Sequence, residues 1–95
     1  MKIAKRELST AILLYKLYGE ESVNIGLVID TIKRELGVTR RTAVNIVRRL
    51  RKLGFLVVES GDVAVNVRLR NPCLVIEEYA LNYLKSRKSR LEPQA

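Results

Sequence analysis

The segment from Val38 to Gly54 constrains the fold most, because apolar and basic residues recur in it with the period of an α-helix. At about 100° per residue, its apolar side chains gather on one side of a helical wheel. They are Ala43, Ile46, Val47, Leu50 and Leu53. The opposite side carries Arg41, Asn45, Arg48, Arg49 and Lys52, with no acidic residue among them. Thr39 is a suitable N-cap and Gly54 a suitable helix stop, so the pattern predicts a helix over residues 40–53 that packs by one face.

The polar side of this helix has side chains of the types that proteins use to read DNA. Arginine can form two hydrogen bonds with guanine, asparagine can do so with adenine, and further cations can contact phosphates. The chain has 18 Lys and Arg against 10 Asp and Glu, and its net charge of +8 favours a polyanionic partner: DNA, RNA or an anionic membrane surface. A basic helix face by itself is often only solvated surface, so the neighbouring segments must decide between these interpretations.

Helical and strand patterns flank this helix. Apolar residues at helical spacing predict helices over residues 5–18 and 26–36, with a polar connection at 20–24 between them. After Gly54 the apolar period changes to two, which predicts a β-hairpin over residues 55–70 around the turn Ser60-Gly61-Asp62. Asn71-Pro72 then begins a fourth helix, over residues 72–89. We expect a single domain over residues 1–95, mainly α with a small β-hairpin, in the α+β class.

The composition argues against several classes of function. The chain has no histidine and a single cysteine, Cys73, so it lacks the usual general base and any cysteine-rich metal site. It contains no Gly-rich phosphate loop, and its carboxylates do not form a convincing catalytic pair. We therefore expect no enzyme activity, no metal and no cofactor. The apolar runs are too short for a membrane-spanning helix, and no signal peptide is evident, so we expect a cytoplasmic, nucleoid-associated protein.

The sequence "VTRRTAVNIVRRLRKLGFLVV", residues 38–58, resembles the recognition helix and first wing strand of the winged helix-turn-helix family. It is most similar in pattern to small MarR-like and ArsR-like transcriptional regulators, and the resemblance extends over residues 8–70. The resemblance implies three helices and a β-hairpin wing, here with an added C-terminal helix. It implies sequence-specific binding of double-stranded DNA, and no small-molecule effector is evident.

The resemblance also implies which residues contact DNA. Those expected to enter the major groove and read bases are Arg40, Arg41, Thr42, Val44, Asn45 and Arg48. Those expected to contact phosphates are Thr39, Arg49, Lys52 and, on the returning wing strand, Arg68. Two alternatives stay open: Val44 could pack in the core, and Thr39 could serve only as a helix cap. The acidic wing tip at 60–62 is expected to contribute little to readout.

The fourth helix is apolar over most of its circumference. One stripe consists of Cys73, Ile76, Ala80, Tyr83 and Leu84, and other apolar residues widen it. Such a helix must be buried on more than one side, which predicts a homodimer. We expect its interface to contain Leu74, Val75, Tyr79, Leu81 and Tyr83. Alternatively, the helix packs only beside the first helix. We expect Cys73 to behave as a small buried hydrophobic residue.

Three rival functions remain open at this point. A non-specific architectural or chromatin protein would also need a high positive charge, although Asn45 and Thr42 favour base readout. A winged helix can instead serve as a protein-interaction module, with the fourth helix as its docking surface. RNA binding lacks the expected aromatic stacking platform, since the chain has one Phe and no Trp.

Overall fold

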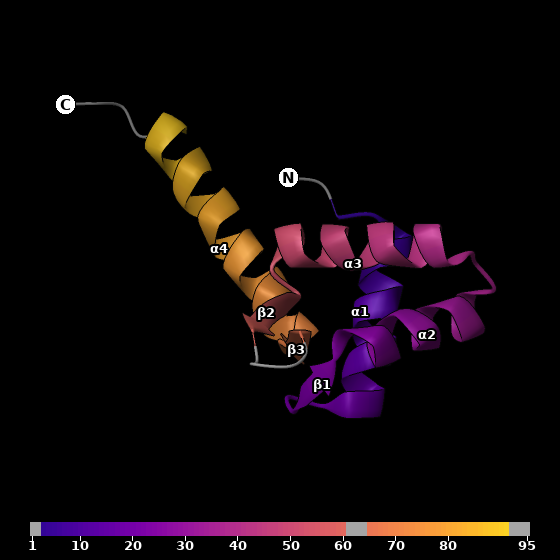
Figure 1. Cartoon of the computed structure of the whole chain (residues 1–95). Coiled ribbons are helices and arrows are strands. Elements are labelled where there is room, and N and C mark those ends of the chain that lie inside the picture. The colour runs from indigo at the N-terminus through magenta and orange to yellow at the C-terminus, as the bar shows by residue number, and fades with distance from the viewer. Residues whose placement is uncertain (1–2, 61–64, 92–95) are drawn as a thin grey trace.

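The computed structural model describes residues 3–60 and 65–91, and the side chains of all of these except 60 and 87–91. The elements are α1 (Lys5–Tyr18), β1 (Ser22–Asn24), α2 (Ile25–Leu36), α3 (Arg40–Leu53), β2 (Leu56–Ser60), β3 (Val65–Leu69) and α4 (Pro72–Leu91) (Figure 1). The expected α+β class is confirmed: a mainly helical chain carries a small antiparallel sheet. The predicted bounds of α1 and α3 are confirmed at both ends, while α2 begins one residue earlier and α4 ends two residues later than expected.

The segment expected to be a polar connection, residues 20–24, instead contains a third strand. β1 pairs antiparallel with β3, which places Val23 opposite Val67, and the strand order is β1-β3-β2. Only Val23 of the three strand residues is buried, so the segment is too short to show an alternating pattern in sequence. The expected turn residues Gly61 and Asp62 lie outside the described residues.

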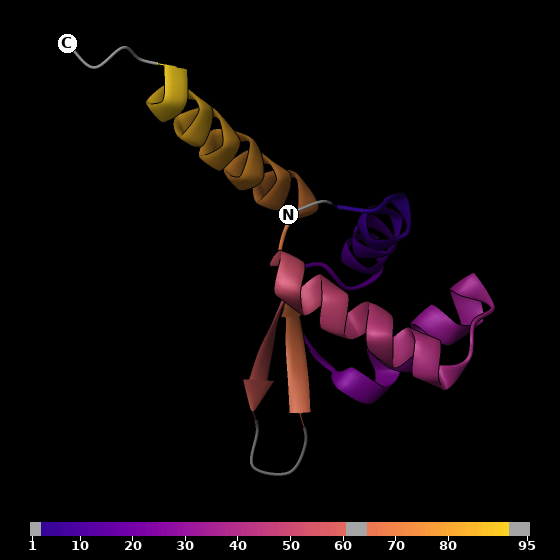
Figure 2. The same cartoon turned by 90° about the horizontal axis from the view of Figure 1, so that it is seen from above.

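The core lies between the first three helices and one face of the sheet. Leu14, Ile32, Ile46, Leu50 and Phe55 are all at most 1% exposed. Each end of α3 is formed as the sequence predicts. The Thr39 hydroxyl accepts a hydrogen bond from the Thr42 amide at 3.2 Å, and Gly54 ends the helix at a φ of 88°. The β2–β3 hairpin follows directly and extends away from this C-terminal end of α3 (Figure 2).

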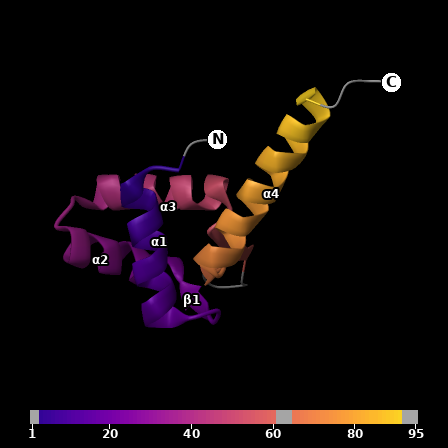
Figure 3. The same cartoon turned by 180° about the vertical axis from the view of Figure 1, so that it is seen from behind.

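Only the first turns of α4 pack against the rest of the protein, and the helix then projects away from the body (Figures 1 and 3). Val75 is 1% exposed within the core, and the Tyr79 hydroxyl donates a hydrogen bond to the Leu53 carbonyl oxygen at 2.7 Å. The sequence-based placement of Val75 in a dimer interface is therefore wrong, because its own domain already buries it. Tyr79 is half-buried on the same side of α4.

The stripe that contains Cys73 and Ile76 lies on the surface of the protein. Cys73 is exposed, so the expectation that it is buried is also wrong. The body instead contacts a different side of α4, formed by Pro72, Val75 and Tyr79, which follow one another at helical spacing.

Burial raises the pKa of the Tyr15 phenol on α1, and the charge and hydrogen bond of Glu20 and the proximity of Cys73 raise this pKa further. Among the described residues, no helix has the length and apolar character needed to cross a bilayer.

Candidate nucleic-acid interface

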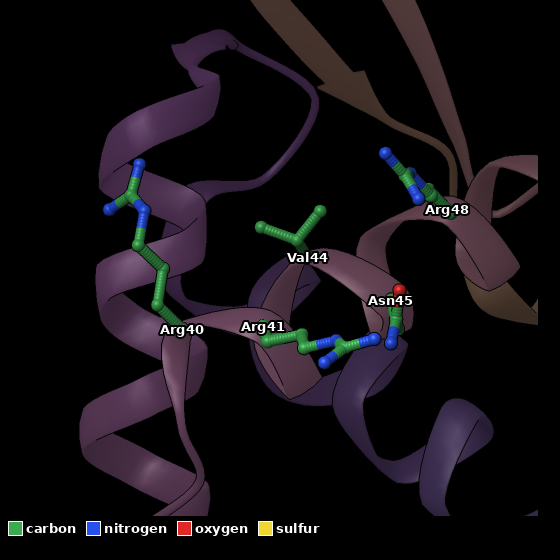
Figure 4. A pocket seen from close by; sticks show the side chains of 5 residues that line it. All are labelled: Arg40, Arg41, Val44, Asn45 and Arg48. Atoms are coloured by element: carbon green, nitrogen blue, oxygen red, sulfur yellow. The ribbon is translucent and has the colours of Figure 1, made fainter.

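The outer side of α3 forms a shallow depression of about 440 Å³ near the beginning of the helix. Its lining is Arg40, Arg41, Val44, Asn45 and Arg48 (Figure 4). Figure 4 shows Val44 between the side chains of Arg40 and Arg48. Val44 is half-buried and reaches this surface, so it is neither a full core residue nor a fully exposed one. The structure thus brings together five of the six residues expected to read bases.

A second depression of about 440 Å³ continues this surface toward the end of α3, between Arg48, Arg51 and Lys52. We call the two depressions together the basic face of α3. Its length follows from the 14 residues of the helix, about 20 Å at 1.5 Å per residue. Arg51 was not among the expected contacts. Its position on the wheel, beside Val44 and about 60° from Arg48, was the signal that could have identified it.

Most cations of the basic face are available to an external partner. Among the described side chains, no acidic group lies within ion-pair distance of Arg41, Arg48, Arg51 or Lys52. Arg40 lies 3.8 Å from the Asp30 carboxylate, and both side chains are about two-thirds exposed. Such an exposed pair contributes little and is readily exchanged for another anion. The face therefore has a concentrated and largely uncompensated positive charge.

Arg49, in contrast, contacts the protein itself. Its Nε atom lies 2.8 Å from Oε1 of Glu7 on α1, and the Glu7 side chain is only 3% exposed. A buried carboxylate needs such a partner, because the desolvated charge is otherwise strongly unfavourable. The second oxygen, Oε2, is buried without a hydrogen-bond partner among the described groups, which makes Arg49 more important to Glu7. The structure thus gives Arg49 a role in joining α1 to α3 that the sequence analysis did not include.

Glu7 was not among the functional residues predicted from the sequence. Glu7, Ala11 and Leu14 recur at helical spacing, and all three are buried. That spacing placed a carboxylate on the inward face of α1 and was a usable signal. A buried acid on one helix predicts a cation on a helix packed against it, and Arg49 of α3 is that cation.

Two further expected phosphate contacts, Thr39 and Arg68, already have partners within the protein. The Thr39 hydroxyl caps α3 and also lies 3.1 Å from the Thr42 hydroxyl, and Thr42 is half-buried. Arg68 donates from Nε to Oε1 of Glu59 and from Nη1 to the Glu20 carbonyl oxygen, both at 2.9 Å. These bonds connect β3 to β2 and to the segment before β1. Arg68 is still half exposed, but its guanidinium is held by the sheet.

The junction of α3 and α4 contains a smaller depression, of about 260 Å³. Arg70 forms an ion pair with Glu78 there and donates to the Gly54 carbonyl oxygen at 3.3 Å. Tyr79 donates to the Leu53 carbonyl oxygen from the same region. These bonds satisfy carbonyl groups at the C-terminal end of α3, so the junction fixes α4 to α3. In the parts of the chain that the structure describes, no three potential metal-ligating side chains lie together.

Comparison of the sequence with models of protein families finds no match, and comparison with curated proteins finds no similar sequence.

Proposed function

We propose that this protein binds double-stranded DNA by placing the basic face of α3 in the major groove. The observation that carries the proposal is a set of four cations that form no ion pair with the described side chains. They share the exposed face of α3 with Asn45, and the opposite face of the helix is buried. An α-helix fits the width of the major groove, and this one can enter without losing any core contact.

The order of the elements supports a winged helix-turn-helix assignment within this proposal. Two helices precede α3, and the antiparallel β2–β3 hairpin follows it, with β1 as a third strand. In that assignment α3 is the recognition helix and the hairpin is the wing. The hairpin extends from the end of α3 and could approach the DNA backbone next to the groove (Figure 2). We propose that this DNA binding regulates transcription, because a protein bound at a promoter blocks access to that promoter without any further activity.

The residues of the basic face would divide the work by their chemistry. Arg41 and Arg48 can each form two hydrogen bonds with guanine, and Asn45 can do so with adenine. Arg51 and Lys52, near the end of α3, would contact phosphates and set the position of the helix on the duplex. Arg49 is assigned to Glu7 and not to phosphate, and Arg68 is assigned mainly to the sheet. This division replaces part of the sequence-based assignment.

The proposal is tested by selection from a pool of randomised duplexes at about 150 mM salt, where weak electrostatic binding fades. We expect the protein to enrich a defined sequence. The double variant Arg41→Glu and Arg48→Glu should then bind the enriched duplex at least 30-fold more weakly, since each lost bidentate contact costs about 1–3 kcal/mol.

The matched control reverses two exposed lysines of α1, Lys5→Glu and Lys16→Glu, which changes the net charge equally. It should bind within about fivefold of the unmodified protein, because a uniform charge effect is small compared with lost base contacts. Equal losses in both double variants, or retention of DNA without an enriched sequence, would favour a non-specific chromatin protein. No retention at any salt concentration would overturn the DNA proposal and favour a protein-interaction module.

A further inference from the structure

An apolar stripe on α4 is exposed although its residues recur at the spacing of a helix–helix seam. Cys73, Ile76, Ala80 and Leu84 are separated by three or four residues, and all four are exposed. Ile76 is 38% and Leu84 is 58% exposed. We call these four residues the α4 seam. Together with Tyr83, they correspond to the heptad pattern that packs one helix against another.

The body of the protein does not cover this seam. The contacts of α4 with the core come from Pro72, Val75 and Tyr79, which lie on a different side of the helix. The C-terminal part of α4 extends beyond the other elements (Figures 1 and 3), although Asn82 still lines the depression at the junction with α3. A helix with few tertiary contacts gains little from its backbone bonds alone, so covering the exposed seam would stabilise this part of α4.

We propose that a second copy of this chain covers the seam, with the two α4 helices antiparallel. The charges of α4 carry the choice of partner and of direction. In its first half Glu78 is already paired with Arg70, whereas Glu77 has no ion pair among the described side chains. Lys85 and, further along the sequence, Arg87, Lys88 and Arg90 make its second half basic. In an antiparallel pair Glu77 of one helix faces the basic half of the other, and the two helix dipoles also oppose each other favourably. A parallel pair would instead place like charges together.

The side chains of the seam fit an antiparallel crossing centred near Ala80. A small residue at the centre lets the helix axes approach to about 8 Å. With that centre, Ile76 of one copy lies opposite Leu84 of the other, four residues away on each side. Glu77 then comes close to Lys85 of the second copy. This pair of helices would form whether or not α3 binds DNA, so the two proposals can fail independently.

Disulfide trapping tests both the contact and its direction. In the variant Ala80→Cys with Cys73→Ser, the two new thiols meet at the centre of the pair, and mild oxidation should convert nearly all of the protein to a covalent dimer. The unmodified protein should not cross-link through Cys73. In an antiparallel pair the two Cys73 residues are 14 residues apart along the axis, about 21 Å, far beyond disulfide reach. Cross-linking through Cys73 would overturn the antiparallel arrangement.

Sedimentation of two charged double variants tests which side of α4 is covered. Ile76→Glu with Leu84→Glu puts carboxylates opposite each other in the seam and should give a folded monomer at concentrations where the unmodified protein is a dimer. The control, Leu74→Glu with Leu81→Glu, changes two residues that were predicted from the sequence to lie in the interface but that lie outside the α4 seam. Each is 52% exposed. It should remain a dimer. An unmodified protein that is monomeric at about 100 μM, or a control that dissociates while the seam variant stays dimeric, would overturn the proposal.

Discussion

Arg48 and Arg49 show how neighbouring residues of one type can have different roles on a helix. A step of about 100° turns Arg48 toward the open basic face and Arg49 toward the buried Glu7. The sequence pattern placed both on the polar side, because a wheel built for one helix does not show what the next helix presents. The spacing of Glu7 on α1 indicated that it faces inward, but only the packing of α1 against α3 shows that Arg49 meets it.

Replacing these two arginines by alanine should therefore affect different properties, DNA affinity for Arg48 and stability for Arg49. Arg48→Ala should weaken DNA binding about tenfold or more and leave the free energy of unfolding unchanged within about 0.5 kcal/mol. Arg49→Ala should lower the free energy of unfolding by about 2 kcal/mol, because it leaves a buried carboxylate without its cation; the partial exposure of Arg49 keeps the loss below that of a fully buried pair.

Urea unfolding and DNA titration of the two variants provide the measurement. The DNA affinity of Arg49→Ala should stay within about threefold of the unmodified protein, since only a general charge effect is lost. If Arg49→Ala weakens DNA binding as much as Arg48→Ala does, then Arg49 contacts DNA and its bond to Glu7 is not its main role.

At the scale of the element, the bounds of long periodic segments were predictable from the sequence. A very short strand was not predictable, and neither was the buried side of a helix with apolar residues on several sides. The bounds of α3 followed from fourteen periodic residues, a threonine cap and a glycine stop. β1 has three residues and a single buried side chain, so its partner strand β3 defines it, not its own pattern. In α4, apolar residues occur on several sides, and the sequence could not show which side contacts the body. The structure assigns Val75 to the core and leaves Leu74 outside.

A pair of substitutions in the first turn of α4 tests this assignment. Val75→Ala should lower the free energy of unfolding by about 2 kcal/mol, because Val75 is 1% exposed and its truncation leaves a cavity in the core. Leu74→Ala removes a larger side chain but should change stability by less than about 0.5 kcal/mol, because Leu74 is half exposed. Urea unfolding at one fixed protein concentration measures both, since a dimer's stability depends on concentration. The reverse order of effects would mean that α4 contacts the body by its other side.

At the scale of the whole molecule, the first turns of α4, which we call its root, connect the basic face of α3 to the α4 seam. Tyr79 and Arg70 donate to the carbonyl oxygens of Leu53 and Gly54, where α3 ends, and Arg70 is also paired with Glu78 on α4. These bonds bridge the helix proposed to read DNA and the helix proposed to bind a second copy. A symmetric dimer would therefore hold its two α3 helices at a fixed separation, and each copy would read the same short sequence on one face of the duplex.

This coupling predicts how binding depends on the spacing of two half-sites. A duplex with two inverted copies of the selected sequence, centred about 10 base pairs or 34 Å apart, should bind two chains far more tightly than a single half-site does. Inserting five base pairs turns one half-site to the opposite face of the duplex, so the affinity should fall to that of a single site. The variant Ile76→Glu with Leu84→Glu should bind a single half-site normally and should be insensitive to the insertion. If the unmodified protein tolerates the insertion while remaining dimeric, the connection between α3 and α4 is flexible and the hydrogen bonds at the root of α4 do not set the spacing.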